Sequence, residues 1–593
     1  MKLLGLKNVK LEGGFLKDKL DLVRNETVDA VWNRFYETGR VGAYECDPKA
    51  EFPAHVFWDS DVIKWAEGAA YYLGLEYDKE LDDKINMLAE LMEKNAFEDG
   101  YYNCYYAVHP ELTRFTNRNN HELYCAGHLF EAAVAYYEAT GNDRLIKISS
   151  KYVDCITKIF MEEKGASFTT PGHQEIELAL LRLYDVTGDE KYLDLARFFL
   201  VMRGHGIKED KGQYNQSHVP VVSMDEAVGH SVRACYLYSG MADYAAVADD
   251  TPMAVACKRL FDNIAKKKMY ITGGIGSTKL GEAFTEAYDL PNDLAYAETC
   301  ASIALLFFAT RMQRLQNDSK YADVAERALY NGVMSGLSLD GVSFFYTNPL
   351  EINMRNRSRY KANVVPEAFP ITQRKRVFGC SCCPPNIVRL MPSLAAYAYG
   401  VDGDTLYVNQ YMDSSVDLDG MKVKVTTDYP VNGNIKISAS GTKRIALRIP
   451  DWCKSFTLDS EYTMQNGYAV VENPSELTLV LDMPVRFVKA NPKIAACRGK
   501  VAVMRGPIVY CAERVDNNFD IFSFFAGEKS EVTVGEAYGG LPTVEFTGHT
   551  VECDDVLYSD SFEPERTPRR IKLIPYYAFA NRGESDMAVW LND

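Results

Sequence analysis

The stretch A-Y-Y-E-A-T-G-N-D-R-L-I-K-I (residues 135–148) shows how this chain forms its helices. Apolar residues at helical spacing stop at Gly141, and a second helical run opens just after the acidic Asp143. Glycine commonly ends helices and acidic residues commonly start them. The same pattern returns at residues 181–195, L-R-L-Y-D-V-T-G-D-E-K-Y-L-D-L, around Gly188. Both stretches therefore predict helical hairpins.

Hairpins of this kind recur along the first two thirds of the chain. Similar breaks between helical runs occur at residues 74–79, 249–252 and 317–320. A last helix at 386–399 completes a sixth pair. Because the spacing is irregular and long loops at 203–224 and 273–293 interrupt it, a closed ring explains the pattern better than a uniform solenoid. We expect residues 1–400 to form an (α/α)6 barrel whose loops build a pocket at one end.

After Gly400 the hydrophobic period changes from about 3.6 to 2. Segments such as M-K-V-K-V-T-T (421–427) and N-I-K-I-S-A-S (434–440) alternate apolar and polar residues between turn residues. Short strands at such spacing favour antiparallel β-sandwiches. We expect one sandwich at residues 401–511 and a second, smaller one at 512–593. A helical catalytic domain with β-sandwich domains behind it is frequent among carbohydrate-active enzymes, which is an argument by analogy.

The charge and the hydrophobicity of the chain limit the classes of molecule that it can bind. The formal net charge is −17, whereas nucleic-acid binding requires clustered Lys and Arg. The N-terminal M-K-L-L-G-L-K lacks the features of a signal peptide, and no apolar run reaches the roughly 18 residues that a membrane span needs. We expect a cytoplasmic protein with neither a nucleic-acid nor a membrane partner. The 38 tyrosines suit stacking against sugar rings, with core packing as the alternative.

The stretch F-G-C-S-C-C-P-P-N (378–386) concentrates cysteines in a chain that has fourteen of them. In a reducing compartment these are thiols. The two prolines predict a helix start, which places Cys382 and Cys383 at its N-terminal edge. The partial positive charge there favours thiolates. Cys380 has no assigned role beyond packing.

Paired thiolates suggest zinc, which takes four tetrahedral ligands from Cys, His, Asp or Glu. The segment A-E-T-C (297–300) precedes an apolar helical run and completes the set. Glu298 and Cys300 are two residues apart, and they converge only at an extended or capping turn. The predicted zinc ligands are Glu298, Cys300, Cys382 and Cys383. Four alternatives stay open. The cysteines could be buried thiols without metal, a redox sensor or a structural zinc knot, or Cys380 could replace one of the four predicted ligands.

A glycine-rich loop (269–293) precedes this segment and carries several carboxylates, among them Glu282 and Glu286. The loop follows no clear strand and lacks the G-K-S/T ending, so it is a poor match to a phosphate-binding loop. Carboxylates near a zinc-thiolate site suggest instead an acid/base partner.

Three motifs resemble glycoside hydrolase family 127, which includes bacterial β-L-arabinofuranosidases. They are T-G-G-I-G-S-T-x-x-G-E (272–282), D-L-P-N-D-x-x-Y-x-E-T-C-A-S (289–302) and F-G-C-x-C-C-P-x-N-I (378–387). Further matches are spread along the chain, including F-W-D-S-D-V-x-K-W (57–65) and G-H-S-V-R (229–233). The resemblance implies an (α/α)6 barrel followed by β-sandwich domains.

The resemblance also implies an exo-acting, retaining hydrolysis of β-L-arabinofuranosides. Cys382 would be a zinc-bound nucleophile, with Glu298, Cys300 and Cys383 as the other ligands and Glu282 as the general acid/base. Glu286 is the rival for that last role. Zinc would keep the sulfur a thiolate and help it leave again. The pKa of Glu282 would have to lie near the working pH, which burial and a negative site could provide.

Five residues are candidates for substrate binding. His121, His173 and His230 stand at helix starts, where a barrel collects its pocket residues, and the resemblance favours the last two. Tyr346 is a further match to the family, and Trp58 could stack on a sugar. For each of them a structural role is the alternative.

Other functions stay open at this point. They are a glycosidase of the same fold acting on a different plant-wall sugar, a polysaccharide lyase, and a non-catalytic zinc protein that binds carbohydrate or responds to redox state. The expected partner is a small oligosaccharide substrate. A homodimer through the β region is a further option that the strand pattern does not decide.

Overall fold

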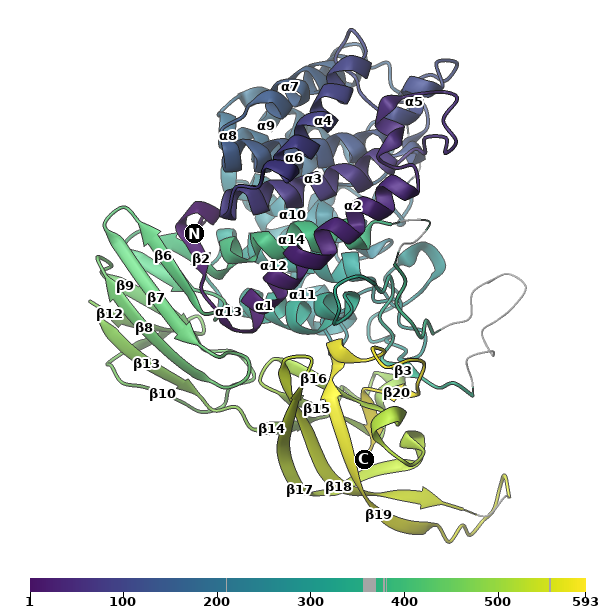
Figure 1. Cartoon of the computed structure of the whole chain (residues 1–593), viewed down its shortest axis with the longest axis vertical. Helices are drawn as coiled ribbons and strands as arrows, with labels where there is room; N and C mark the ends of the chain where they lie inside the picture. Colours follow the sequence, from purple (N-terminus) through teal and green to yellow (C-terminus); the bar gives the residue numbers. More distant parts are fainter. Residues whose placement is uncertain (209–210, 356–369, 377–378, 380, 554–555) are drawn as a thin grey trace.

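The structure is a computed structural model. It describes residues 1–593 except 209–210, 356–369, 377–378, 380 and 554–555. Cys380 therefore lies outside the described residues. The helical domain forms one end of the molecule and two β units form the other (Figure 1).

Six helices form an inner ring in the helical domain. They are α3 (Trp58–Leu75), α6 (Glu122–Thr140), α8 (Ile176–Thr187), α10 (Ser231–Ala248), α12 (Thr299–Leu315) and α14 (Cys383–Ala398). Each contacts the next in this order, and α14 contacts α3, which closes the ring. These helices are buried along most of their length because they have neighbours on all sides.

Six more helices cover this ring from outside. They are α2 (Val28–Glu37), α4 (Lys79–Asn95), α7 (Arg144–Thr157), α9 (Glu190–Met202), α11 (Thr251–Asn263) and α13 (Ser319–Arg327). Each packs against an inner helix next to it in the chain. The outer helices bury one apolar stripe and expose the opposite face, as surface helices do. The predicted (α/α)6 barrel is thereby confirmed.

The hairpins predicted from sequence join inner and outer helices. Gly141 ends α6 with a φ of +76°, and Gly188 ends α8 with a φ of +68°. This left-handed conformation costs glycine little, and in both turns the glycine N–H donates to a carbonyl of the last helical turn. Asp189 then caps α9 by accepting from the backbone N–H of Lys191.

All six inner helices begin at the same end of the barrel. One cavity is lined by a residue at or just before each of these helix starts: Phe57, His121, His173, His230, Glu298 and Cys382. Helix N-termini carry partial positive charge and unpaired backbone N–H groups. Their convergence favours carboxylates and thiolates in that cavity.

The first β unit is built from two six-stranded sheets. One has the order β1 (Lys2–Leu3), β4 (Tyr399–Asp402), β5 (Thr405–Val408), β9 (Arg444–Arg448), β12 (Tyr468–Glu472), β11 (Thr463–Gln465). The other has the order β10 (Phe456–Leu458), β13 (Glu476–Leu481), β8 (Asn434–Ser440), β7 (Met421–Thr427), β6 (Ser414–Leu418), β2 (Val9–Leu11). Strands β7 and β8 alternate buried and exposed residues, as their period of two predicts. The first residues of the chain thus pair with this unit, although we had expected them in the barrel domain.

The second β unit is a nine-stranded sheet. Its order is β14 (Val485–Val488), β15 (Lys500–Arg505), β21 (Trp590–Asn592), β17 (Phe524–Tyr538), β18 (Leu541–Glu552), β19 (Glu565–Pro575), β16 (Ile508–Glu513), β20 (Met587–Ala588), β3 (Glu351–Ile352). A further pairing between β15 and β16 folds the sheet back on itself.

The change from one β unit to the other falls between β13 and β14. The boundary expected after residue 511 would instead cut through β16, which pairs with β19 in the second unit. Alternating residues identify strands, but they do not indicate which sheet a strand joins. Among the described helices, none is both long and apolar enough to cross a membrane.

Candidate active site

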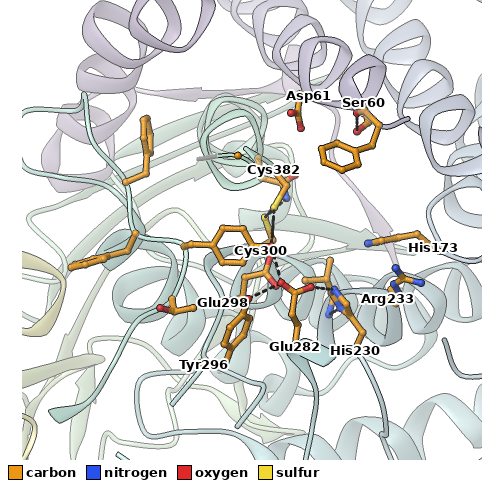
Figure 2. A pocket seen from close by; sticks show the side chains of 18 of the residues that line it. Ser60, Asp61, His173, His230, Arg233, Glu282, Tyr296, Glu298, Cys300 and Cys382 are labelled. Atoms are coloured by element: carbon orange, nitrogen blue, oxygen red, sulfur yellow. Dashed lines mark hydrogen bonds and ion pairs between the residues drawn. The ribbon is translucent and has the colours of Figure 1, made fainter. Parts of the chain in front are cut away.

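A cavity of about 680 Å³ opens at the end of the barrel where the inner helices begin. Its walls carry the thiol of Cys382, the carboxyl of Glu282, three histidines and several tyrosines (Figure 2). Loops around residues 279–282, 344–347 and 371–375 contribute further lining residues. The cavity is therefore polar and contains the groups that the sequence motifs singled out.

The four predicted metal ligands lie together at the wall formed by α12 and α14. The sulfur of Cys300 lies 3.4 Å from that of Cys382 and 3.3 Å from that of Cys383, and the latter two sulfurs are 3.8 Å apart. One carboxylate oxygen of Glu298 is 3.6 Å from the Cys382 sulfur. All three cysteines are free thiols. Ligand atoms from the four residues fall within 4.8 Å of one another.

Two helix starts produce this convergence. Cys382 is the N-cap of α14, with prolines in the first turn, and Glu298 is the N-cap of α12, with Cys300 in its first turn. Glu298 has an extended-type ψ of 139° and follows Ala297, whose φ is +37°. This capping turn brings Glu298 and Cys300 to the same side, as the two-residue spacing required. Since α12 and α14 are neighbours in the ring, the two motifs meet.

The donor set fits a soft divalent metal ion. A tetrahedral ion with metal–sulfur distances of about 2.3 Å would separate its ligands by about 3.8 Å, and the sulfur–sulfur distances approach this value. Burial raises the pKa of Cys300, but hydrogen bonds with Cys382 and Cys383 outweigh it and lower the pKa to about 6. Burial raises the pKa of Cys383. A cation would relieve the crowding of three sulfurs by holding them as thiolates.

Glu282 lies in the same cavity, with a carboxylate oxygen within 4.8 Å of one of Glu298, and is held by three side chains. The Nε2 atom of His230 is 2.7 Å from its Oε2 atom. The hydroxyls of Tyr296 and Tyr346 donate to its Oε1 atom over 2.6 and 3.0 Å. The backbone of Glu282 has a φ of +52°, which is uncommon for a residue other than glycine and is found often at functional sites.

These contacts change the expected proton affinity of Glu282. Burial raises the pKa of Glu282, as expected, but the hydrogen bonds from His230, Tyr296 and Tyr346 outweigh it and lower the pKa to about 2. Hydrogen bonds to the charged form favour that form. Our expectation of a pKa near the working pH is therefore wrong for the protein without substrate, in which Glu282 is a carboxylate.

Tyr346 contacts both the carboxyl of Glu282 and the thiol of Cys382. Its hydroxyl lies 3.0 Å from Oε1 of Glu282 and 3.7 Å from the sulfur of Cys382. One hydroxyl group thus spans the gap between the thiol and the carboxylate.

Three histidines follow one wall of the cavity. The ring centroids of His121 and His173 are 5.9 Å apart, and those of His173 and His230 are 5.6 Å apart. Burial lowers the pKa of all three, that of His121 to about 3. They are therefore neutral and suited to hydrogen bonds with hydroxyl groups. His230 accepts the N–H of Val232 at Nδ1, so its Nε2 carries the proton that faces Glu282.

Two predicted candidates do not face this cavity. Trp58 is the first residue of α3. The guanidinium carbon of Arg40 lies 5.1 Å from the centroid of the Trp58 ring. The preceding residue, Phe57, lines the cavity instead. The helix start turns these adjacent side chains in different directions. Glu286 is exposed and is not part of the cavity lining, so only Glu282 of the two rivals faces the thiols.

The sequence analysis missed several lining residues, and three of them stand inside motifs that it quoted. Tyr296 lies inside the motif that ends in Glu298, Arg233 ends G-H-S-V-R, and Lys64 stands in F-W-D-S-D-V-x-K-W. Their positions inside these motifs could have indicated that they belong to the site. Lys64 is completely buried and donates to the hydroxyl of Tyr124 over 2.7 Å. Arg233 is 5% exposed and donates to the carbonyl of Gly172.

Comparison with known proteins agrees with this fold and site. Family models match three parts of the chain: the β-L-arabinofuranosidase GH127 catalytic domain at residues 8–396, the GH127 middle domain at 405–478 and the glycoside hydrolase family 127 C-terminal domain at 485–592. A non-reducing end β-L-arabinofuranosidase from Bifidobacterium longum subsp. longum is 36% identical, over 93% of this chain and 91% of that protein.

Solved structures show the same similarity in three dimensions. A GH127 β-L-arabinofuranosidase from Geobacillus stearothermophilus T6 has a TM-score of 0.93 and 40% identity, covering 99% of this chain and all of the other. A second GH127 β-arabinofuranosidase has a TM-score of 0.90 and 36% identity, covering 100% of this chain and 97% of the other. The fold and the site define a glycoside hydrolase with a helical-barrel catalytic domain. With all three of its domains matched, the chain belongs to glycoside hydrolase family 127.

Proposed function

We propose that this glycoside hydrolase is an exo-acting, retaining β-L-arabinofuranosidase that uses Cys382 as its nucleophile and Glu282 as its acid/base. The observation that carries the proposal is the placement of the two groups in one cavity, with the hydroxyl of Tyr346 3.0 Å from the carboxylate and 3.7 Å from the sulfur. The names of the similar proteins supply the sugar. A small oligosaccharide with a terminal arabinofuranose is the corresponding substrate.

Zinc is the proposed metal, and Glu298, Cys300, Cys382 and Cys383 would hold it. Three thiols and one carboxylate form a donor set that zinc accepts readily. When bound, zinc would keep Cys382 a thiolate at neutral pH and stabilise the sulfur as a leaving group. The cavity side of the cluster is open at Cys382, which is half-buried, whereas Cys300 and Cys383 are buried. Cys382 is thus the sulfur that a sugar can reach.

The first step forms a bond between the Cys382 sulfur and the anomeric carbon while the glycosidic carbon–oxygen bond breaks. The departing oxygen takes a proton from Glu282, and an S-glycosyl intermediate remains on Cys382. In the second step Glu282 takes a proton from water, whose oxygen attacks the same carbon and releases the sulfur. Two inversions give net retention.

Glu282 must carry a proton before the first step, although its pKa is low without substrate. A sugar between Cys382 and Glu282 must occupy the place where the Tyr346 hydroxyl now contacts both. Loss of that hydrogen bond from the carboxylate, together with exclusion of water, raises the pKa of Glu282. Proton uptake by Glu282 would therefore accompany substrate binding.

The proposal is tested by incubating the purified protein with aryl β-L-arabinofuranosides and aryl α-L-arabinofuranosides. Release of L-arabinose from the β anomer, with the β product first seen by NMR, is the expected result. Hydrolysis of the α anomer alone, or an inverted first product, contradicts it.

A different terminal sugar is the second candidate, and Arg233 favours it. This buried guanidinium lines the cavity, and its described partners are the carbonyl of Gly172 and the ring of Tyr214 rather than a carboxylate. A sugar acid could satisfy such a group. A panel of defined plant-wall oligosaccharides with neutral and acidic terminal sugars separates the two candidates by which sugar is released.

Metal removal is expected to destabilise the protein as well as inactivate it. The cluster joins the starts of α12 and α14, so metal bound there stabilises the folded state over the unfolded state. Free zinc at about a thousand times the dissociation constant would contribute about 4 kcal/mol. Chelation should therefore lower the melting temperature measured by calorimetry, and added zinc should restore it.

The matched control for this experiment is the double variant Cys300→Ser, Cys383→Ser, which lacks two ligands. Its melting temperature should not respond to chelator or zinc. An equally large response in this variant, or none in the wild-type protein, would show that the cluster is not the metal site.

A further inference from the structure

A row of polar residues continues along α14 below the thiols. Asn386 and Arg389 follow Cys383 at steps of three in the sequence C-P-P-N-I-V-R. Residues three apart lie on the same side of a helix. Asn386 is 1% and Arg389 is 2% exposed. Polar groups buried this deeply cost free energy unless they are hydrogen-bonded, so their partners indicate what they do.

Asn386 contacts one of the three sulfurs. Its Nδ2 atom donates to the sulfur of Cys300 over 3.0 Å. Its Oδ1 atom accepts from Nε of Arg389 over 2.7 Å. An amide can present either its oxygen or its nitrogen to a neighbour, but a guanidinium only donates. Arg389 therefore selects the orientation in which the amide N–H groups face the sulfur.

Arg389 is itself held from two other inner helices. Its Nη1 atom donates to Glu67 of α3 over 2.9 Å, and its Nη2 atom donates to the hydroxyl of Tyr236 of α10 over 2.8 Å. The planar guanidinium thus uses donors at three positions at once in a fully packed environment. Because it cannot rotate without breaking these contacts, the orientation of Asn386 is fixed by the barrel itself.

The contact distinguishes Cys300 from Cys382. A hydrogen bond to a thiolate favours the charged form and withdraws electron density from the sulfur. The Nδ2 atom of Asn386 also lies 3.4 Å from the hydroxyl of Tyr236, but of the three sulfurs the described contacts join it only to that of Cys300, whereas the half-buried Cys382 faces the cavity. The sulfur of Cys300, which accepts the amide N–H, is therefore the better permanent ligand. The sulfur of Cys382, which does not, stays the better nucleophile.

We propose that Asn386, oriented by Arg389, is a positioning residue that holds the sulfur of Cys300 in place as a permanent ligand of the metal and leaves Cys382 as the reacting sulfur. The assignment of Cys382 as the reacting sulfur rests on the proposed function. The effect of Asn386 on metal binding at the cluster does not depend on which sugar is hydrolysed.

The test uses the full-length variants Asn386→Ala and Asn386→Leu. The leucine variant keeps the approximate shape of the side chain in case the smaller one leaves a disruptive cavity. Metal affinity is measured by competition with a chromophoric zinc chelator, and the cobalt-loaded proteins are compared by their sulfur-to-cobalt charge-transfer spectra. Partners of metal ligands commonly contribute about 10- to 100-fold to metal affinity. We expect at least a tenfold loss of affinity and a shifted charge-transfer band.

Asn331 provides a matched control. It is fully buried, its amide donates to the carbonyls of Arg327 and Pro507, and its described hydrogen bonds include none to a residue of the thiol cluster. Asn331→Ala removes a comparable buried amide, so its metal affinity should stay within twofold of wild type. Affinity and charge-transfer spectra unchanged in both Asn386 variants would overturn the proposal, as would an equal loss of affinity in Asn331→Ala.

The experiments distinguish a failure of the proposed function from a failure of the role proposed for Asn386. A wild-type protein that binds zinc tightly but releases no arabinose would contradict the proposed sugar hydrolysis, while weaker metal binding by the Asn386 variants would still support the role of Asn386. On metal-saturated enzyme, a lower kcat at unchanged KM in these variants is the expected kinetic result.

Discussion

Replacing Cys382 by serine should lower kcat/KM on an aryl β-L-arabinofuranoside by at least about 10⁴-fold. Removal of a nucleophile in other hydrolases costs up to about 10⁶ in kcat. A serine hydroxyl is far less acidic than a thiol and stays protonated near neutral pH, and it is a poor metal ligand compared with a thiolate. The fold should persist, because Cys382 is half-buried at the N-cap of α14 and serine is a favourable N-cap residue.

The matched control for this prediction is Cys46→Ser. Cys46 is also half-buried, and its sulfur contacts the carbonyl of Tyr44 outside the cavity. This variant should keep wild-type kcat/KM. Mass spectrometry adds a direct test, since a slowly released arabinoside should add one arabinosyl group to the peptide containing Cys382. A folded Cys382→Ser protein with more than about a tenth of wild-type activity would rule out the thiol nucleophile.

Local helix chemistry explains why the cluster of Glu298, Cys300, Cys382 and Cys383 could be predicted from the sequence. Prolines after Cys383 and the apolar run after Cys300 each mark a helix start. Helix starts are set by neighbouring residues, so sequence patterns report them well. The barrel then places these two starts side by side, and the repeated hairpins had predicted that closed ring.

Features that depend on contacts between distant segments were not predictable in the same way. Tyr346 stands 64 residues from Glu282 in the chain, and its hydrogen bond helps to lower the pKa of that carboxyl. Likewise, strand β2 joins β6 across about 400 residues. Nothing local in Val9–Leu11 indicates that partner. Periodicity identifies elements, whereas pairing and proton affinity depend on the assembled structure.

Replacing Glu282 by glutamine should lower kcat/KM by about 10²- to 10⁴-fold on substrates with poor leaving groups, the usual range for a general acid/base. Glutamine keeps the size of the side chain and can still accept from Tyr296 and Tyr346, so the cavity should be preserved. It cannot transfer a proton to the leaving oxygen or take one from water. Glu286→Gln is the matched control, because that side chain is exposed outside the cavity, and its activity should stay within twofold of wild type.

Leaving-group dependence separates catalysis by Glu282 from a structural effect. An acidic phenol departs without protonation, so the first step in Glu282→Gln should be nearly normal on a nitrophenyl arabinofuranoside. The second step still needs a base, and the enzyme should therefore release a burst of phenol and accumulate the arabinosyl adduct on Cys382. A variant that lost activity through a distorted cavity would be equally slow on all leaving groups and would show no burst. Equal loss with good and poor leaving groups would thus assign Glu282 to the structure of the site and leave its acid/base to be found elsewhere in the cavity.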